Sequence, residues 1–124
     1  MHELGMCEGI LDTALRRAAG RPVTRVRVRV GVLHRAVGPA MEQAFLLVAA
    51  GTEAEGAELD MVTLPVRVTC RACGAERDSD ELLIACPACG SGELDQAGGD
   101  ELLLESIELT PDAERSAHVS RDSG

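Results

Sequence analysis

The sequence predicts an α+β fold: two helices packed on a three-stranded sheet, with an inserted four-cysteine, zinc-ribbon-like domain. Apolar residues recur at helical spacing in two segments and alternate as in strands in others, and two Cys-x-x-Cys pairs precede the last strand. The expected order is helix, strand, helix, strand, metal-binding insert and strand. The insert should therefore leave and re-enter the same sheet.

Two segments have the pattern of amphipathic helices. The first covers residues 4–19, where Gly20 and Pro22 then stop the helix. Its apolar face consists of Leu4, Cys7, Leu11, Leu15 and Ala18. The second covers residues 39–50, with Pro39 suited to a first helical turn.

Three segments have the pattern of strands. Residues 23–31 alternate valine with arginine, which predicts a half-buried strand with a cationic outer face. Residues 58–69 predict a second strand, whose apolar parity changes beside Pro65. Because proline cannot donate to a ladder, we expect a bulge or bend there and an edge position. Residues 101–109 predict the third strand.

These elements divide the 124-residue chain into two domains and a tail. Residues 1–69 together with 100–110 should form the helix-and-sheet domain, and residues 70–99 the zinc-binding domain. Residues 111–124 are polar and lack any period, so we expect a disordered tail.

The composition excludes several kinds of function. The chain has one Phe, no Tyr and no Trp, which leaves almost nothing on which a nucleobase could stack. Its net charge of −9 argues against a nucleic-acid partner. All twelve cationic residues are arginine, so every catalytic role of lysine is excluded. Residues 1–52 carry a net charge of +3 and the remainder −12, so the cationic strand face and the acidic zinc half are candidate docking surfaces.

No segment predicts a membrane span or a secretory signal. No apolar run approaches the ~18 residues that a spanning helix requires. The first residues lack a basic segment followed by an apolar one. We therefore expect a cytoplasmic protein without a membrane partner, whose clustered cysteines stay reduced and bind metal.

The four clustered cysteines predict a structural zinc site. They stand as Cys70-Arg71-Ala72-Cys73 and Cys86-Pro87-Ala88-Cys89, with twelve residues between the pairs. Four thiolates complete a tetrahedral zinc site and leave no position for water, so catalysis by this metal is not expected. Iron in a rubredoxin-like site and thiol redox chemistry are the alternatives.

The first three residues form a possible second metal site. The amine of Met1, the backbone nitrogen of His2 and its imidazole can bind one metal in fused chelate rings, and Glu3 can add an oxygen. Such a nitrogen and oxygen set suits Ni(II) or Cu(II). The alternative is a solvated terminus that binds no metal. His34 could approach this site, whereas Cys7 is expected to be a packed core thiol.

Taken together, these features resemble the HypA/HybF family of nickel metallochaperones for [NiFe]-hydrogenase maturation, some of which also serve urease. The similarity covers about residues 1–109 and includes both cysteine pairs. Its other segments are Met1-His2-Glu3-Leu4, Val28-Arg29-Val30-Gly31, Gly51-Thr52-Glu53-Ala54-Glu55-Gly56-Ala57, Gly99-Asp100-Glu101-Leu102 and Ser106-Ile107-Glu108. The resemblance implies that His2 is the central nickel ligand, with the Met1 amine and Glu3 beside it. It also implies two partners, a HypB-type GTPase and the hydrogenase large-subunit precursor.

The sequence departs from the family in one loop. Members commonly carry an acidic residue after the first strand, whereas residues 32–39 here contain none. The fourth nickel ligand therefore stays open among His34, Glu3 and water. We expect a non-enzymatic metallochaperone that carries Ni(II) and holds a structural Zn(II). The alternatives are a zinc-ribbon protein-interaction module and a small tetrathiolate iron redox protein.

Overall fold

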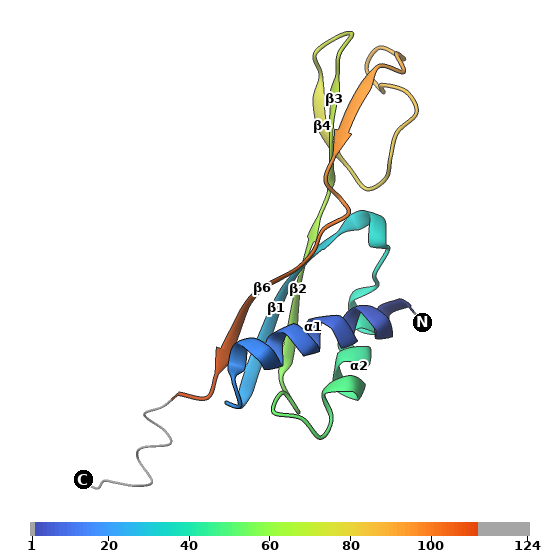
Figure 1. Ribbon diagram of the computed structural model, residues 1–124. Helices are drawn as coiled ribbons and strands as arrows, with labels where there is room; N and C mark the ends of the chain where they lie inside the picture. The colour runs from blue at the N-terminus through green and yellow to red at the C-terminus, as the bar shows by residue number, and fades with distance from the viewer. Residues whose placement is uncertain (1, 112–124) are drawn as a thin grey trace, which may run out of the picture.

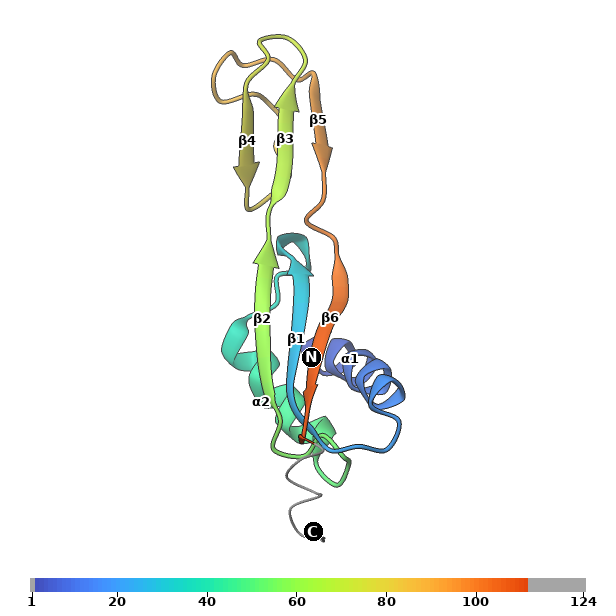
Figure 2. The same ribbon diagram turned by 90° about the vertical axis from the view of Figure 1, so that its left-hand side faces the viewer.

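The protein is elongated, with two three-stranded sheets arranged end to end (Figures 1 and 2). The computed structural model describes residues 2–111. Met1 and residues 112–124 lie outside that range, and with them nearly all of the tail that we expect to be disordered. The helices lie beside the first sheet, and the cysteines lie at the far end of the second.

The first sheet has the strand order β2-β1-β6. The central strand β1 (Val23–Gly31) pairs parallel with β2 (Glu58–Leu64) and antiparallel with β6 (Leu102–Leu109). Helices α1 (His2–Ala18) and α2 (Gly38–Ala49) cover one face of this sheet, as Figure 2 shows. The predicted packing of two helices on a three-stranded sheet is therefore confirmed. Neither helix combines the length and the apolar character needed to cross a membrane.

The core lies between the helices and the valine-bearing face of β1. Val26, Val28 and Val30 are buried there, as their alternation with arginine predicts. Helix α2 adds Met41 and Phe45, both buried. The apolar cluster around these residues includes none from the second sheet, so the two ends of the molecule are packed separately.

The opposite face of the first sheet carries a ladder of ion pairs. Arg25, Arg27 and Arg29 project from β1, each nearly half-exposed. Their partners are carboxylates of the two flanking strands: Glu58, Asp60, Glu105 and Glu108. The distances run from 3.0 Å for Arg25–Glu58 to 4.0 Å for Arg25–Asp60. The expected cationic docking face is therefore corrected to a charge-balanced one, because the neighbouring strands supply the opposite charges.

The prediction of one strand over residues 58–69 was wrong. Strand β2 ends at Leu64, and after Pro65 the chain enters a second sheet. The strands of this sheet, in the order β4-β3-β5, are Glu76–Ser79, Val66–Cys70 and Leu94–Ala97. Pro65 has no N–H to continue the first ladder, so the expected bend becomes a change of sheet.

The chain crosses between the sheets twice, at Pro65 and at Gly98–Asp100. The second crossing packs directly against the segment that follows β1. A Cβ on Gly31 would overlap the backbone of Gly99, and Gly99 has a φ of +85°. The Leu33 N–H donates to the Gly99 carbonyl at 2.7 Å. This crossing therefore lies against the loop that leads from β1 to α2.

Candidate metal centres

The structure brings all four clustered cysteines together. Cys70 ends β3, and the tight turn after it carries Cys73. A second turn carries Cys86 and Cys89. All four sulfurs lie within 4.8 Å of one another, and the Cys70–Cys89 and Cys73–Cys86 Sγ distances are 3.7 and 3.8 Å.

These distances fit a tetrahedral metal and not disulfides. Zinc–sulfur bonds of about 2.3 Å place the sulfurs of a regular tetrahedron about 3.8 Å apart. A disulfide would require about 2.05 Å. The cluster is thus the right size for one Zn(II), whose coordination shell the four sulfurs would complete.

Backbone donors hold the two cysteine turns and favour the thiolate of Cys86. In each turn a glycine N–H donates back to a cysteine carbonyl, Gly74 to Cys70 at 2.9 Å and Gly90 to Cys86 at 2.7 Å. The backbone N–H groups of Cys89 and Ala88 lower the pKa of Cys86 to about 6. Because metals bind the thiolate, these backbone donors prepare the site for a cation.

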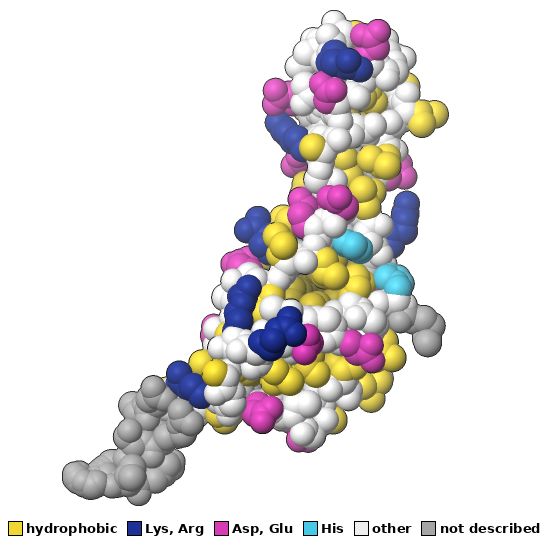
Figure 3. Space-filling model, in the orientation of Figure 1, with side chains coloured by type: hydrophobic (Ala, Val, Ile, Leu, Met, Phe, Trp, Pro, Cys, Tyr) yellow, Lys and Arg dark blue, Asp and Glu magenta, His cyan; other side chains and the backbone are white. Residues whose placement is uncertain are grey.

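The second candidate centre lies at the start of α1. The Nε2 of His2 is 2.9 Å from the carbonyl oxygen of His34. The Nε2 of His34 is in turn 2.9 Å from the carbonyl oxygen of Asp100, in the second crossing. Figure 3 shows the two described histidines in cyan beside each other on one surface. The His34 backbone therefore lies against His2, as the sequence allowed, whereas the His34 ring points to Asp100.

Glu3 faces inward beneath His2. One carboxylate oxygen accepts the N–H of Val37 at 3.5 Å, just before α2 begins. The other oxygen lies 3.6 Å from the Nδ1 of His2. Its own backbone N–H and that of Val37 lower the pKa of Glu3, against the opposing effect of burial. Glu3 is therefore ionised at neutral pH and places negative charge beside the imidazole.

Sequence reasoning missed Asp100 as a neighbour of this centre. Its backbone carbonyl makes the contact, so no pattern of side chains in the sequence predicts it. The only local signal is its place beside the glycines of the return segment. Cys7 belongs to neither centre. It is buried, as expected of a packed thiol, and donates to the Met41 carbonyl at 3.4 Å.

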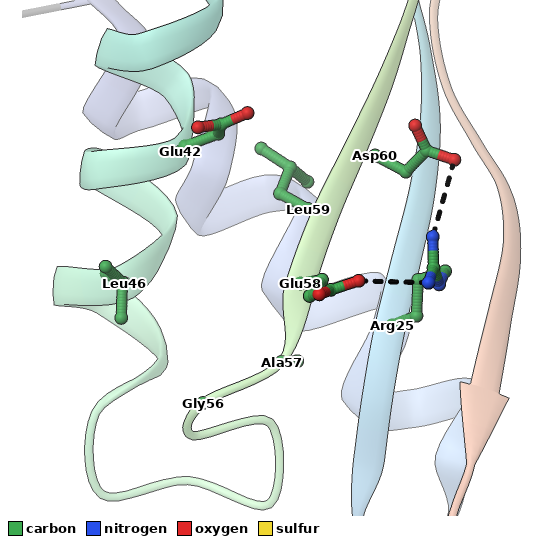
Figure 4. Close-up of a pocket in the computed structure, with 8 residues that line it drawn as sticks. All are labelled: Arg25, Glu42, Leu46, Gly56, Ala57, Glu58, Leu59 and Asp60. Atoms are coloured by element: carbon green, nitrogen blue, oxygen red, sulfur yellow. Dashed lines mark ion pairs between the residues drawn. The ribbon is translucent and has the colours of Figure 1, made fainter.

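A pocket of about 500 Å³ opens between α2 and β2, remote from both centres (Figure 4). Leu46 of α2 and Leu59 of β2 line it from its two sides, whereas Glu58 and Asp60 turn away from α2 toward Arg25. Its lining contains neither histidine nor cysteine. Among the described residues, the pocket holds no group of three or more converging metal ligands. Glu58 and Asp60 are engaged in the ion-pair ladder, whereas Glu42 comes from α2 on the other side of the pocket.

Comparison with known proteins places the chain in a family. The family model described as hydrogenase/urease nickel incorporation, metallochaperone, HypA matches residues 1–109. The chain is 38% identical over 112 residues to the hydrogenase maturation factor HypA of Paracoccus denitrificans, which covers 88% of this chain and 99% of that protein. The HypA of Desulfitobacterium hafniense is also 38% identical, with 88% and 98% covered.

Solved structures show the same fold. The solution structure of the Ni metallochaperone HypA from Helicobacter pylori matches with a TM-score of 0.58 at 21% identity, and covers 86% of this chain and 96% of that one. Another HypA solution structure gives a TM-score of 0.51 at 22% identity, with 86% and 88% covered. Together with the family match over nearly the whole described chain, these findings establish that the protein belongs to the HypA family of nickel-incorporation metallochaperones.

Proposed function

We propose that this protein binds Ni(II) at its N-terminus and delivers it during maturation of [NiFe]-hydrogenase. The observation that carries the proposal is the position of His2 at the exposed start of α1, with an ionised carboxylate beside its ring. The His2 side chain is 54% exposed, and Nδ1 lies 3.6 Å from Glu3. An imidazole, a nearby amine and one carboxylate oxygen match the preferences of Ni(II).

The ligand set suits a carrier. The Met1 amine and His2 would bind the metal, and Glu3 would add an oxygen or hold the site electrostatically. Few protein ligands at an exposed position leave room for a recipient to approach and exchange ligands. Release therefore requires no unfolding of the helix-and-sheet domain.

The four cysteines would hold a resident zinc ion. The sulfur spacing supports this role, and a closed tetrathiolate site supplies structural stability and no chemistry. We infer that Cys70, Cys73, Cys86 and Cys89 keep the two turns together without exchanging metal with the N-terminus. The protein would act without catalysis, in the cytoplasm, with a HypB-type GTPase and the hydrogenase large-subunit precursor as partners.

The N-terminal site is tested by nickel titration calorimetry on tag-free protein. His2→Ala removes the imidazole, and a Gly-Ser extension before Met1 moves the amine away without removing a side chain. Each change should weaken nickel binding at least about tenfold, or about 1.4 kcal/mol. Zinc content should stay at one per chain, and His118→Ala is the matched control. Unchanged affinity in His2→Ala would refute the proposed site.

Because the chain has no lysine, the rate of amine labelling can test the role of the Met1 amine independently. With no lysine in the chain, an α-amine at Met1 is its single primary amine. An amine-specific reagent should therefore modify one position, and bound nickel should slow that modification. Equal labelling rates with and without nickel would remove the amine from the ligand set while leaving His2 and Glu3 in place.

A further inference from the structure

A chain of two hydrogen bonds links the start of α1 to the second crossing. It runs from the His2 ring to the His34 carbonyl, and from the His34 ring to the Asp100 carbonyl. Each step is 2.9 Å from a ring Nε2 to a backbone oxygen. A carbonyl oxygen can only accept a hydrogen bond, so each Nε2 must carry the hydrogen and donate it. In the neutral imidazole of His2, the lone pair is then on Nδ1.

Nδ1 is the nitrogen that an N-terminal chelate needs. It closes a six-membered ring with the backbone nitrogen of the same residue and the metal, whereas Nε2 lies across the imidazole and cannot. Nδ1 is also the nitrogen nearer to Glu3, at 3.6 Å. The contact with the His34 carbonyl therefore occupies Nε2 and leaves the lone pair of Nδ1 on the side of the ring nearer to Glu3.

The His34 carbonyl is itself held in place from both sides. His34 ends the short helix Val32–His34. On its N-terminal side, the Leu33 N–H donates to the Gly99 carbonyl. After His34, Arg35 has a left-handed φ of 55°, and its N–H donates to the Val32 carbonyl at 3.0 Å. The His34 side chain adds its bond to Asp100. An exposed loop fixed this closely can orient a neighbouring side chain.

We propose that His34 is a positioning residue for nickel binding. Its carbonyl accepts the hydrogen of His2 Nε2, and its ring anchors that carbonyl to Asp100. The proposal rests on the proposed nickel site and assigns His34 no bond to the metal.

The geometry favours positioning over ligation by His34. Within residues 2–111, the only group of three or more His, Cys, Asp or Glu side chains with converging ligand atoms is the cysteine cluster. His34 therefore does not converge with His2 and Glu3, and its Nε2 points to Asp100. A ligand role would require that bond to break.

Two variants separate the roles. His34→Ala removes the anchor, whereas His34→Gln keeps an N–H donor at similar reach but offers no imidazole. We expect His34→Ala to weaken nickel binding about tenfold, as removal of residues that orient a ligand commonly does. His34→Gln should bind nickel within about threefold of the wild type. Zinc content and the helical circular dichroism signal should stay unchanged in both.

The second readout is the nitrogen NMR spectrum of the metal-free protein. His2 should show the hydrogen on Nε2 in the wild type and in His34→Gln, and a mixture of tautomers in His34→Ala. A His34→Gln variant as weak as His34→Ala would make His34 a ligand and overturn the proposal. Full affinity in His34→Ala would also overturn it. If His2→Ala binds nickel normally, the proposed nickel site fails, whereas the tautomer measurement still reports whether His34 holds His2.

Discussion

Cys7 is the one cysteine outside the metal cluster, and it is packed as a hydrophobic residue. Burial, together with the nearby charge of Glu3, raises the pKa of its thiol to about 11. The neutral S–H donates to the Met41 carbonyl of α2 and so joins the two helices. A thiol in this state reacts poorly and binds metal poorly at neutral pH.

This raised pKa predicts a loss of stability in alkaline solution. The folded protein holds the thiol proton more tightly than the unfolded chain, whose pKa is near 9.0. The contribution of Cys7 is therefore complete below pH 9 and is lost as the pH rises through about 11. We expect the free energy of unfolding to fall by up to about 2 kcal/mol over this range. Urea titrations should show that part of the decrease disappear in Cys7→Ala, and parallel curves would contradict the assignment.

The residues of the two centres differ in how far the sequence could predict them. The cysteine cluster follows from spacing alone, because two Cys-x-x-Cys turns bring four sulfurs together. For His2 and Glu3, the chemistry of a terminal chelate left a solvated terminus as the alternative, and the family resemblance implied the nickel ligands, which stay a prediction. The contact between the His34 ring and the Asp100 carbonyl could not be predicted, because these two residues are 66 positions apart and the acceptor is a backbone oxygen.

Among the elements, the loop before Cys86 is tied to β5 by the side chain of Gln96. Gln96 of β5 accepts the Leu83 N–H at 2.7 Å and donates to the Leu83 carbonyl at 2.9 Å. It therefore pairs with Leu83 as a neighbouring strand would. The flanking Leu82 and Ile84 project into solvent, 59% and 95% exposed.

Gln96→Ala should release this loop. The variant leaves the N–H and carbonyl of Leu83 without their partner, at a local cost of about 1–3 kcal/mol. We expect the amide hydrogen of Leu83 to exchange at least about tenfold faster, while the amides of β1 keep their rates. Gln43→Ala, an exposed glutamine on α2, is the matched control. Unchanged exchange at Leu83 would show that the rest of the loop holds it.

The helices and the first sheet were predictable because their signals are local. Alternation placed β1 at residues 23–31, as observed, and glycine and proline marked the ends of both helices. Strands β4 and β5 were not predicted, because Glu76–Ser79 and Leu94–Ala97 are short and mostly polar. They become strands by pairing with β3, and this pairing is a property of the tertiary fold.

At the scale of the whole molecule, the two ends are stabilised differently. The first sheet and the helices share a continuous apolar core. The second sheet buries chiefly Val66 and Val68, together with Cys70 and Cys86. So small a core cannot fold alone, and a structural zinc contributes roughly 10–16 kcal/mol in small peptides.

Cys73→Ala should therefore separate the two ends. With three thiolates left, we expect loss of tight zinc binding and loss of amide protection in β3–β5. The helical circular dichroism signal should persist, because α1 and α2 pack on the other core. Cys7→Ala should keep one zinc per chain as the control. Complete loss of the helical signal in Cys73→Ala would refute the expected division into residues 1–69 with 100–110 and residues 70–99.

The double crossing between the sheets also has a consequence for the order of folding. Strands β2 and β6 both pair with β1, yet residues 65–101 separate them in the chain. Closing a loop costs about 0.6 kcal/mol more for each doubling of its length. Once metal has folded the insert, Arg67 faces Ala97 and its two ends lie side by side. Residues 65–67 and 97–101 then remain as an effective loop of about eight residues, about two halvings shorter. The entropic cost of bringing β6 to β1 falls by about 1.3 kcal/mol. An ion bound at the far end of the molecule would thus accelerate assembly of the sheet on which α1, with His2 at its start, is packed.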